Sequence, residues 1–217
     1  MHIASGLLVG DKVTMNEMLP KLKARADRKS AKRDAKKRQI AESAISALKE
    51  LGYANTSLRD IAAHSDLSLG MLHYYFEDRA ELIIFCVEIY KQEFVRKFVE
   101  ALEMASGREQ VIDAFAEALV SSIVDDDMAH RMWYDIRTQA VFDETFRPIV
   151  AEIEALLIGI VRSAFEKAGH GEPQQIEISY ALLDGAFRYV LQTQIEGAER
   201  SRRQLFETFQ GLLRQFL

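Results

Sequence analysis

The stretch from Ser57 to Leu82 limits what this chain can fold into more than any other part of it. Ser57 and Asp60 have the spacing of a capping box, in which each side chain bonds the other residue's backbone N–H where a helix begins. Residues 65 and 66, a Ser-Asp pair, should end that helix, and Ser68 can cap a second, very short one. The pattern predicts two short helices joined by a tight turn.

A third helix should follow, because Asp78 and Glu81 repeat the capping-box spacing. Two short helices joined by a turn of a few residues form a helix-turn-helix unit, whose second helix is built to lie in the major groove of DNA. The segment from Ser68 to Tyr74 is the candidate for that second helix. It can serve only if one of its sides is exposed.

The same stretch, together with the helix before it, resembles the DNA-binding domain of the tetracycline-repressor (TetR-like) family of transcriptional regulators. The resemblance covers roughly residues 38–82 and rests on the spacing of a hydrophobic frame. The matching residues are Ile45, Leu48, Gly52, Ser57, Ile61, Ala62, Leu67, Gly70, Leu72, Tyr74, Phe76 and Leu82.

Three positions depart from the family pattern. Asp66 stands where Gly is usual, but Asp is one of the few residues that tolerate a left-handed turn conformation. Arg79 replaces a common Lys and keeps its charge. His73 stands where Tyr is frequent, which leaves the base contacts at this position open.

Apolar residues recur at helical spacing from Lys32 onward, and no segment alternates as a strand does. The predicted fold is all-α, and the resemblance implies an N-terminal three-helix helix-turn-helix domain plus a larger C-terminal helical domain for ligand binding and dimerisation. Residues 1–31 form a basic extension without assigned structure, 32–78 the DNA-binding domain and 79–217 the larger domain. Outside the helix-turn-helix, helices are predicted over 32–51, 79–104, 108–124, 127–141, 144–168, 174–196 and 201–217.

Charge is unevenly distributed along the chain, whose net charge is −5. Residues 21–38 contain ten Lys and Arg residues against Asp27 and Asp34, so the rest of the chain is strongly acidic. A basic segment just before a helix-turn-helix fits an electrostatic footprint on DNA, with a body that phosphates do not attract. Taken alone, the same segment would be a solvated basic tail.

The single cysteine, Cys86, excludes an internal disulfide framework and fits a reducing cytoplasm. It lies in an apolar run, which favours a buried, inert thiol over a redox role. The apolar stretch 153–161 is far too short to span a bilayer, and residues 1–9 lack a charged leader. Neither a membrane segment nor a signal peptide is predicted.

The predicted DNA interface combines side chains that read bases with side chains that hold phosphates. Polar groups on the second helix can hydrogen-bond base edges, its apolar groups can touch thymine methyl groups, and its glycine permits close approach. Tyr75 is explained equally well as a packed side chain. The base-reading candidates are Ser68, Leu69, Gly70, Met71 and His73, and the phosphate candidates are Arg38, Thr56, Ser57, Arg59, Tyr74, Tyr75 and Arg79.

Two helices of the larger domain carry aromatic and charged side chains on one face. Aromatics joined by a few charges are typical of a small-molecule pocket, but aromatic stripes are also typical of a core. Asp184 and Arg188 can equally form an ion pair across one turn. The predicted pocket residues are His130, Trp133, Tyr134 and Arg137 on one helix, and Tyr180, Asp184, Phe187 and Arg188 on the other.

Residues 182–191, together with Met132-Trp133, look like the ligand domain of the betaine-pathway repressor branch of the family. This similarity implies a response to choline, whose quaternary ammonium aromatic groups can hold. The effector itself stays unidentified. An acidic run at residues 125–127 could bind a cation, but capping of a helix start explains it better. No cofactor and no metal site is predicted.

The last two helices each carry an apolar stripe, which either packs inside the chain or forms a two-fold seam between two chains. The resemblance implies a homodimer through these helices, and a dimer also doubles the length of DNA that is read. The stripes are Ile176, Tyr180, Leu183, Phe187, Val190 and Leu191, then Leu205, Phe209, Leu212, Leu213 and Phe216.

The leading hypothesis is a dimeric, ligand-responsive transcriptional regulator, a repressor, that binds a palindromic operator in double-stranded DNA. A DNA-binding adaptor without a small-molecule effector is the alternative. A small helical enzyme is a third possibility, but the sequence contains no Gly-rich phosphate loop, nucleophile elbow or pair of metal-binding histidines.

Overall fold

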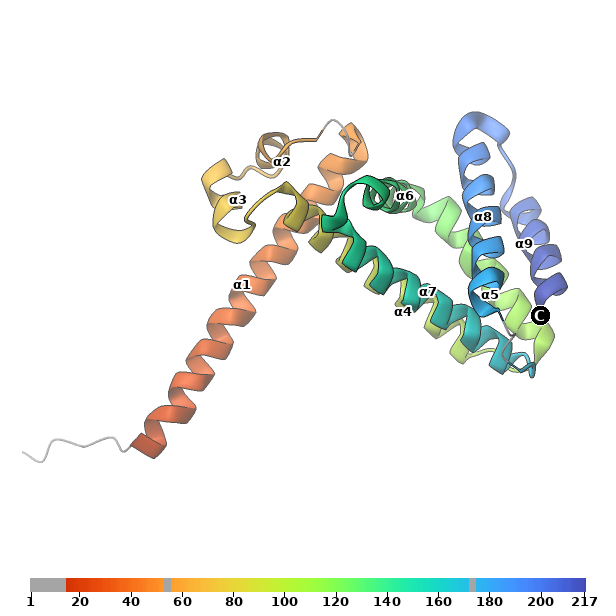
Figure 1. Ribbon diagram of the computed structural model, residues 1–217, viewed down its shortest axis with the longest axis horizontal. Coiled ribbons are helices and arrows are strands. Elements are labelled where there is room, and N and C mark those ends of the chain that lie inside the picture. The colour runs from red at the N-terminus through yellow and green to blue at the C-terminus, as the bar shows by residue number, and fades with distance from the viewer. Residues whose placement is uncertain (1–14, 53–55, 172–174) are drawn as a thin grey trace, which may run out of the picture. The chain divides into compact units, whose positions relative to one another are not determined.

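The computed structural model describes residues 15–52, 56–171 and 175–217, and within these ranges the side chains of 15–29, 49, 128 and 129 lie outside the description. The described part of the chain contains helices and turns but no strand, as the predicted all-α class requires (Figure 1). It divides into two compact units, Met1–Ile40 and Ala41–Leu217. The border lies inside the first helix, and the predicted domain borders at 31/32 and 78/79 stay predictions.

The first helix, α1, spans Met15–Leu51 and is longer than expected. The sequence predicted its start near Lys32, whereas its first turns fall within the segment that had no assigned structure. Residues 21–51 contain neither Gly nor Pro and are rich in Ala, Lys and Arg, which have high helix propensity. The helix ends as predicted, because Gly52 adopts a positive φ of 78° and its N–H bonds the Leu48 carbonyl at 2.9 Å.

The helix-turn-helix consists of α2, Leu58–His64, and α3, Leu69–Tyr75. The capping box at Ser57 is complete, since its hydroxyl accepts from the N–H of Asp60 while the Asp60 carboxylate accepts from the N–H of Ser57. Asp66 sits in the turn with φ 51°, the left-handed conformation that Asp tolerates. Ser68 caps α3 by accepting from the N–H of Met71 at 3.1 Å. These local predictions are confirmed.

The next helix, α4, spans Arg79–Glu103. Asp78 caps it by accepting from the N–H of Glu81 at 2.8 Å. The second half of the predicted capping box is wrong, because the Glu81 carboxylate accepts from the N–H of Glu77, one residue before the cap, at 2.6 Å. The longer Glu side chain reaches past the cap residue, so the start of α4 is bonded to the segment that follows α3.

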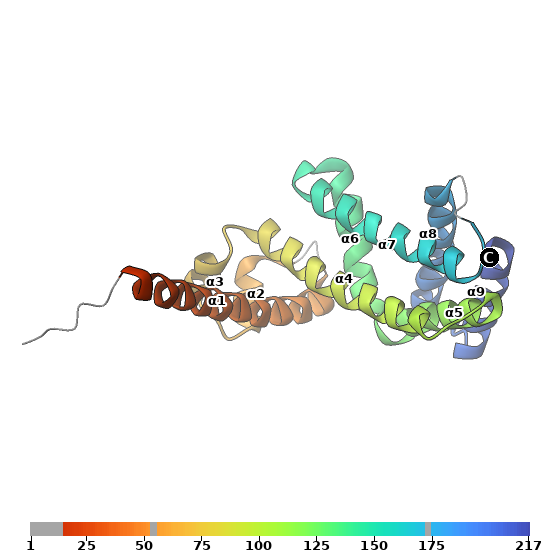
Figure 2. The ribbon, with the colours of Figure 1, turned by 90° about the horizontal axis from the view of Figure 1, so that it is seen from below.

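Five further α-helices complete the described chain (Figures 1 and 2). Helix α5 packs along α9, while α4 packs against α5 and α7, and α7 packs against α8. A 3-10 turn at Glu144–Phe146 precedes α7 and places Pro148 in its first turn, where Pro is tolerated. The bounds are α5 Arg108–Asp125, α6 Asp127–Phe142, α7 Arg147–Lys167, α8 Ile176–Thr193 and α9 Arg202–Phe216.

A π-helical turn at Gln194–Ala198 separates α8 from α9, and Gly197 breaks the helical path there with φ 99°. The apolar stripes of these two helices pack inside their own chain. All six stripe residues of α8 are buried, as are Leu205, Phe209 and Leu213 of α9, while Leu212 and Phe216 are half-buried. The intrachain interpretation of these stripes is therefore the right one, and a seam between two chains would have to use other faces.

Candidate nucleic-acid interface and ligand cavity

Helix α3 presents two different sides. Leu72 and, directly after the helix, Phe76 are buried and fix α3 to the rest of its domain. Met71 is 42% exposed and Tyr74 is 67% exposed. Gly70 and His73 are also exposed, and Leu69 is half-exposed. The outer side of α3 is therefore exposed, as it must be if this helix is to lie in the major groove of DNA.

The predicted phosphate contacts fall into two groups. Ser57, Arg59 and Tyr74 are exposed around the helix-turn-helix, and Tyr75 is half-buried and meets the Tyr74 ring edge-on at 4.9 Å. Arg38 is exposed on α1, in the other compact unit.

Thr56 and Arg79 are tied to each other through the backbone. The Thr56 side chain is 2% exposed and its hydroxyl donates to the Gly52 carbonyl at 2.6 Å. The half-buried Arg79 donates from Nε to the Thr56 carbonyl at 2.6 Å. This arrangement does not support the predicted phosphate contact for the Thr56 hydroxyl. Its visible role is to connect the end of α1 to the segment before α2.

In the larger domain, a mostly apolar cavity of about 60 Å³ lies among α4, α5, α6, α7 and α8. Six of the eight predicted pocket residues line it, namely His130, Trp133, Tyr134, Tyr180, Asp184 and Phe187. Apolar side chains from other helices complete the wall; they include Phe94, Phe98, Phe115, Leu119 and Leu157. The sequence pattern therefore predicted the faces of α6 and α8 that line the cavity.

Arg137 and Arg188 do not line the cavity but support its wall. Arg137 pairs with Asp184 and, at 2.8 Å, with Glu154 on α7. Asp184 also accepts from the Tyr134 hydroxyl at 3.1 Å. The suggested Asp184–Arg188 pair is wrong, because Asp184 is engaged by α6. Arg188 instead lies over the Tyr134 ring, 5.6 Å from its centroid.

Lys91 is the cavity residue that the sequence interpretation missed. It is 2% exposed on α4 and lines the cavity. Its ammonium lies 4.6 Å from the ring centroids of both Phe94 and Trp133. A signal was present, since Lys91 falls on the same helical face as Val87, Phe94 and Phe98. A lysine inside an apolar stripe is a candidate for burial.

Burial also changes the titration of the groups around the cavity. It lowers the pKa of Lys91 to about 7, an effect that Asp184 opposes and Arg137 reinforces. Burial, together with the positive charges of Lys91 and Lys97, lowers the pKa of His130 well below its usual value. The His130 ring is therefore neutral. Burial raises the pKa of Tyr134 and of Tyr180, and both hydroxyls stay protonated.

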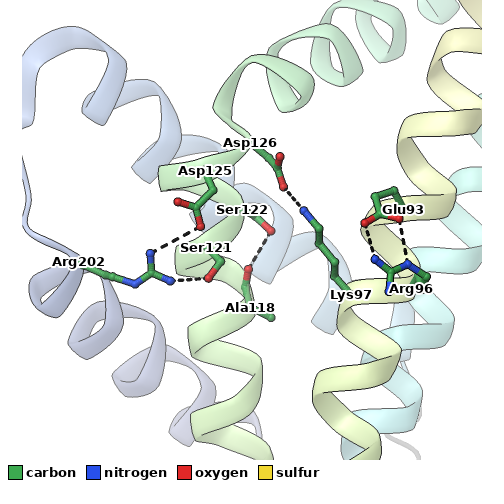
Figure 3. Close-up of polar contacts among 9 residues, drawn as sticks. All are labelled: Glu93, Arg96, Lys97, Ala118, Ser121, Ser122, Asp125, Asp126 and Arg202. Atoms are coloured by element: carbon green, nitrogen blue, oxygen red, sulfur yellow. Dashed lines mark hydrogen bonds and ion pairs between the residues drawn. The ribbon is translucent and has the colours of Figure 1, made fainter. Parts of the chain in front are cut away.

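The acidic run before α6 is used for ion pairs (Figure 3). Asp126 accepts from Lys97 of α4 at 2.6 Å, and Asp125 lies 3.7 Å from Arg202 of α9. Asp127 pairs with Arg131 one turn along α6 at 2.7 Å. The described residues contain no cluster of three His, Cys, Asp or Glu side chains with the geometry to hold a metal ion.

The Cys86 thiol is buried, and burial raises its pKa, which keeps it a protonated, weakly reactive thiol. Among the described residues, no helix has the length and apolar character needed to cross a membrane.

Comparisons with known proteins agree with this geometry. Residues 40–84 match the family model described as bacterial regulatory proteins, tetR family. The HTH-type transcriptional regulator PksA of Bacillus subtilis (strain 168) is 25% identical over 158 residues, covering 70% of this chain and 77% of that protein.

Two solved structures show the same fold. A transcriptional regulator from Rhodococcus sp. Rha1 superposes with a TM-score of 0.71 at 15% identity, covering 82% of this chain and 94% of that one. GusR of Salmonella enterica gives a TM-score of 0.67 at 20% identity, covering 83% and 94%.

Proposed function

We propose that this chain is a TetR-like transcriptional regulator that acts as a homodimer, binds a palindromic operator through α3 and changes its DNA affinity when a small molecule enters the cavity. Repression by occupying the operator is the mode that the family resemblance favours, in the cytoplasm where the DNA lies. The observation that carries the proposal is the two-sided α3, with a buried Leu72 and an exposed outer face.

Base readout by this helix would be modest. Its exposed side offers His73, Ser68 and the Met71 thioether, none of which forms the bidentate contacts that Arg, Asn or Gln make with bases. Affinity would then depend strongly on phosphate contacts and on DNA shape. A single seven-residue helix reads few bases, which is why a second copy at a fixed spacing is part of the proposal.

Arg79 at the start of α4 provides a test of the phosphate contacts. Arg79→Ala should weaken binding to all DNA sequences and reduce the slope of log affinity against log salt by about one unit, because one counterion fewer is released. Arg131→Ala, which removes an exposed arginine from α6, is the matched control and should leave the slope unchanged. Fluorescence-anisotropy titrations across a salt series measure both.

The hydrogen bond from Arg79 to the Thr56 carbonyl suggests a structural role for Arg79, which a different result would reveal. If Arg79→Ala lowers the melting temperature but leaves the salt slope intact, Arg79 holds the helix-turn-helix together and touches no phosphate.

The dimer interface is proposed on the outer face of α8. Ile178, Leu182 and Tyr189 are exposed there at helical spacing, with Gly185 between them, opposite the buried stripe of the same helix. An apolar stripe on an otherwise amphipathic surface helix is typical of a helix–helix contact. The contact would be self-complementary, as a two-fold axis requires.

Leu182→Glu should convert the dimer to a monomer, because a two-fold axis brings the same substituted position of both chains into one apolar interface. Sedimentation velocity measures the change. Val141→Glu, an equally drastic change at an exposed position of α6, should leave the association state intact. A dimer that survives Leu182→Glu would remove the α8 face from the interface.

Coupling between ligand and DNA has a physical basis in the size of the cavity. At about 60 Å³ it is much smaller than the roughly 300–1,000 Å³ of ordinary ligand pockets. A molecule of more than a few atoms must therefore displace lining side chains or helices to enter. One wall belongs to α4, and only three residues separate its start from the end of the helix-turn-helix. A ligand that prefers the displaced state shifts the balance between the two states.

Selection of DNA fragments by the purified protein tests the function as a whole. We expect a palindromic consensus whose half-site centres are roughly 34–36 Å, or a multiple of this, apart. A single non-palindromic site would contradict the two-fold arrangement. The adaptor alternative predicts the same DNA result but no thermal shift with any small molecule.

A further inference from the structure

We propose that the cavity binds a small monocarboxylate with an apolar body, and that its carboxylate is held by Lys91 and neighbouring hydrogen-bond donors. This inference rests on the proposed regulatory function for its biological meaning, but not for its chemistry. It assigns the ligand class from the groups that the cavity leaves without partners.

The Lys91 ammonium is buried among aromatic rings. Its ammonium contacts the aromatic rings of Phe94, Trp133 and Tyr90, with Nζ 4.6, 4.6 and 5.3 Å from their centroids. Among the described residues Lys91 forms no direct ion pair or hydrogen bond beside these contacts, and Asp184 acts on its charge only at longer range. A buried charge without a direct ion pair is costly, and an anion in contact with it would relieve the cost.

Several buried polar atoms of the cavity wall have no hydrogen-bond partner in the described part of the chain. Trp133 Nε1, Tyr180 Oη and His130 Nε2 are buried without a hydrogen-bond partner, and all three residues line the cavity. An indole N–H can only donate, a phenol can donate, and an ammonium has three donors. Buried polar groups left without partners in this way indicate a missing ligand or ordered water. The neutral His130 ring has one donor and one acceptor nitrogen, so Trp133, Tyr180 and Lys91 give the cavity more unpartnered donors than acceptors.

Among the described residues that line the cavity, Asp184 is the only carboxylate. Asp184 lines the cavity, but it is already bonded to Arg137 and to the Tyr134 hydroxyl. Arg137 in turn also pairs with Glu154. Both Asp184 oxygens are therefore engaged, so Asp184 attracts the Lys91 charge through space but offers it no free acceptor. A ligand carboxylate, with two oxygens and no donor, supplies what the cavity lacks.

The same geometry argues against the quaternary ammonium that the betaine-branch similarity implied. The aromatic faces suited to a cation already hold the Lys91 ammonium. A second cation there would meet like charge in a desolvated site. The rest of the wall, which includes Phe98, Phe115 and Leu157, is apolar and suits a ring or a short alkyl chain.

Calorimetric titration of the full-length protein at pH 6 tests the inference, with benzoate and hexanoate, their uncharged amides, and benzyltrimethylammonium as probes. We expect at least one carboxylate to bind ten or more times more tightly than its amide. Equal binding of acid and amide, tighter binding of the ammonium probe, or no binding by any probe (a cavity that holds ordered water only) would each overturn it.

A pH readout ties the effect to Lys91. The facing titratable groups are His130, which is neutral, the protonated Tyr134 and Tyr180, and the paired Asp184 and Arg137. Since the pKa of Lys91 lies at about 7, carboxylate affinity should fall roughly tenfold from pH 6 to pH 8. Binding at pH 8 should take up a proton, so its heat should differ between buffers of different protonation enthalpy.

Two variants complete the design. Lys91→Met keeps the length of the side chain and should abolish both the preference for acid over amide and the proton uptake. Lys97→Met removes an equal charge from an exposed site on the same helix and should preserve both. A preference that survives Lys91→Met would overturn the inference.

DNA binding is measured on the same wild-type sample without probe. Operator binding without carboxylate binding would defeat only the inference, whereas carboxylate binding without DNA binding would defeat only the proposed function.

Discussion

Replacing Lys91 by methionine is expected to raise the free energy of unfolding at pH 6 by up to about 5 kcal/mol, because each unit by which burial lowers the pKa of Lys91 corresponds to about 1.4 kcal/mol. Methionine fills nearly the same volume among the same aromatic rings and removes the need to bury a charge. The stabilisation should be larger than that of any surface substitution, because Lys91 is 2% exposed.

The effect should also depend on pH, and its sign follows from proton linkage. The pKa of Lys91 is about 7 in the folded chain against 10.5 for an unperturbed lysine. Below pH 7 both states are protonated, and the folded state bears the full cost of the buried charge. Between pH 7 and 10.5 the unfolded state binds more protons, so the wild-type protein becomes more stable relative to the variant as pH rises.

Urea denaturation at pH 6 and pH 9 measures this difference, and the advantage of Lys91→Met should shrink at the higher pH. Lys97→Met is the control, because its ammonium is exposed and its pair with Asp126 contributes little. A variant less stable than wild type at pH 6, or an advantage equal at both pH values, would contradict a net cost of burying the Lys91 charge.

The second large effect is expected from two neighbouring residues of α3. Leu72→Ala should lower the free energy of unfolding by about 2–5 kcal/mol, because it leaves a cavity at a fully buried position. Met71→Ala should change stability by no more than about 0.5 kcal/mol, since Met71 faces solvent.

DNA binding separates the two variants further. Met71→Ala should weaken binding to the selected operator while the fold stays intact. Leu72→Ala should weaken it because α3 loses its packing against the rest of its domain. Chemical denaturation and anisotropy titrations on the same samples measure both quantities. If Met71→Ala leaves operator affinity unchanged, the outer face of α3 does not contact bases through this side chain.

Local features of the chain could be predicted without coordinates. The caps at Ser57 and Ser68, the left-handed Gly52 and the left-handed Asp66 all appear as expected. Each depends on interactions within about four residues, so the sequence around each position contains all the information needed. The incomplete box at Asp78 shows the limit, because two N–H groups competed for the Glu81 carboxylate and spacing alone could not rank them.

The candidate cavity was predicted only in part. Helical periodicity placed six residues on faces that meet in it, but could not show which helices would come together. The partner of Asp184 proved to be Arg137, which lies 47 positions away on another helix, rather than Arg188 one turn away. Lys91 was overlooked because the same residue on an exposed stripe would be unremarkable, and only its neighbours decide whether it is buried.

The sequence by itself determined the helical class, most helix ends and the position of the helix-turn-helix, since these follow from short-range hydrogen bonds and from the period of apolar residues. Tertiary structure alone decided what each apolar face packs against: the α8 stripe turned out to fill its own chain's core, and an aromatic cluster enclosed a lysine. The period of apolar residues shows that one face of a helix must be buried. Which other helix covers that face depends on contacts between residues far apart in the chain.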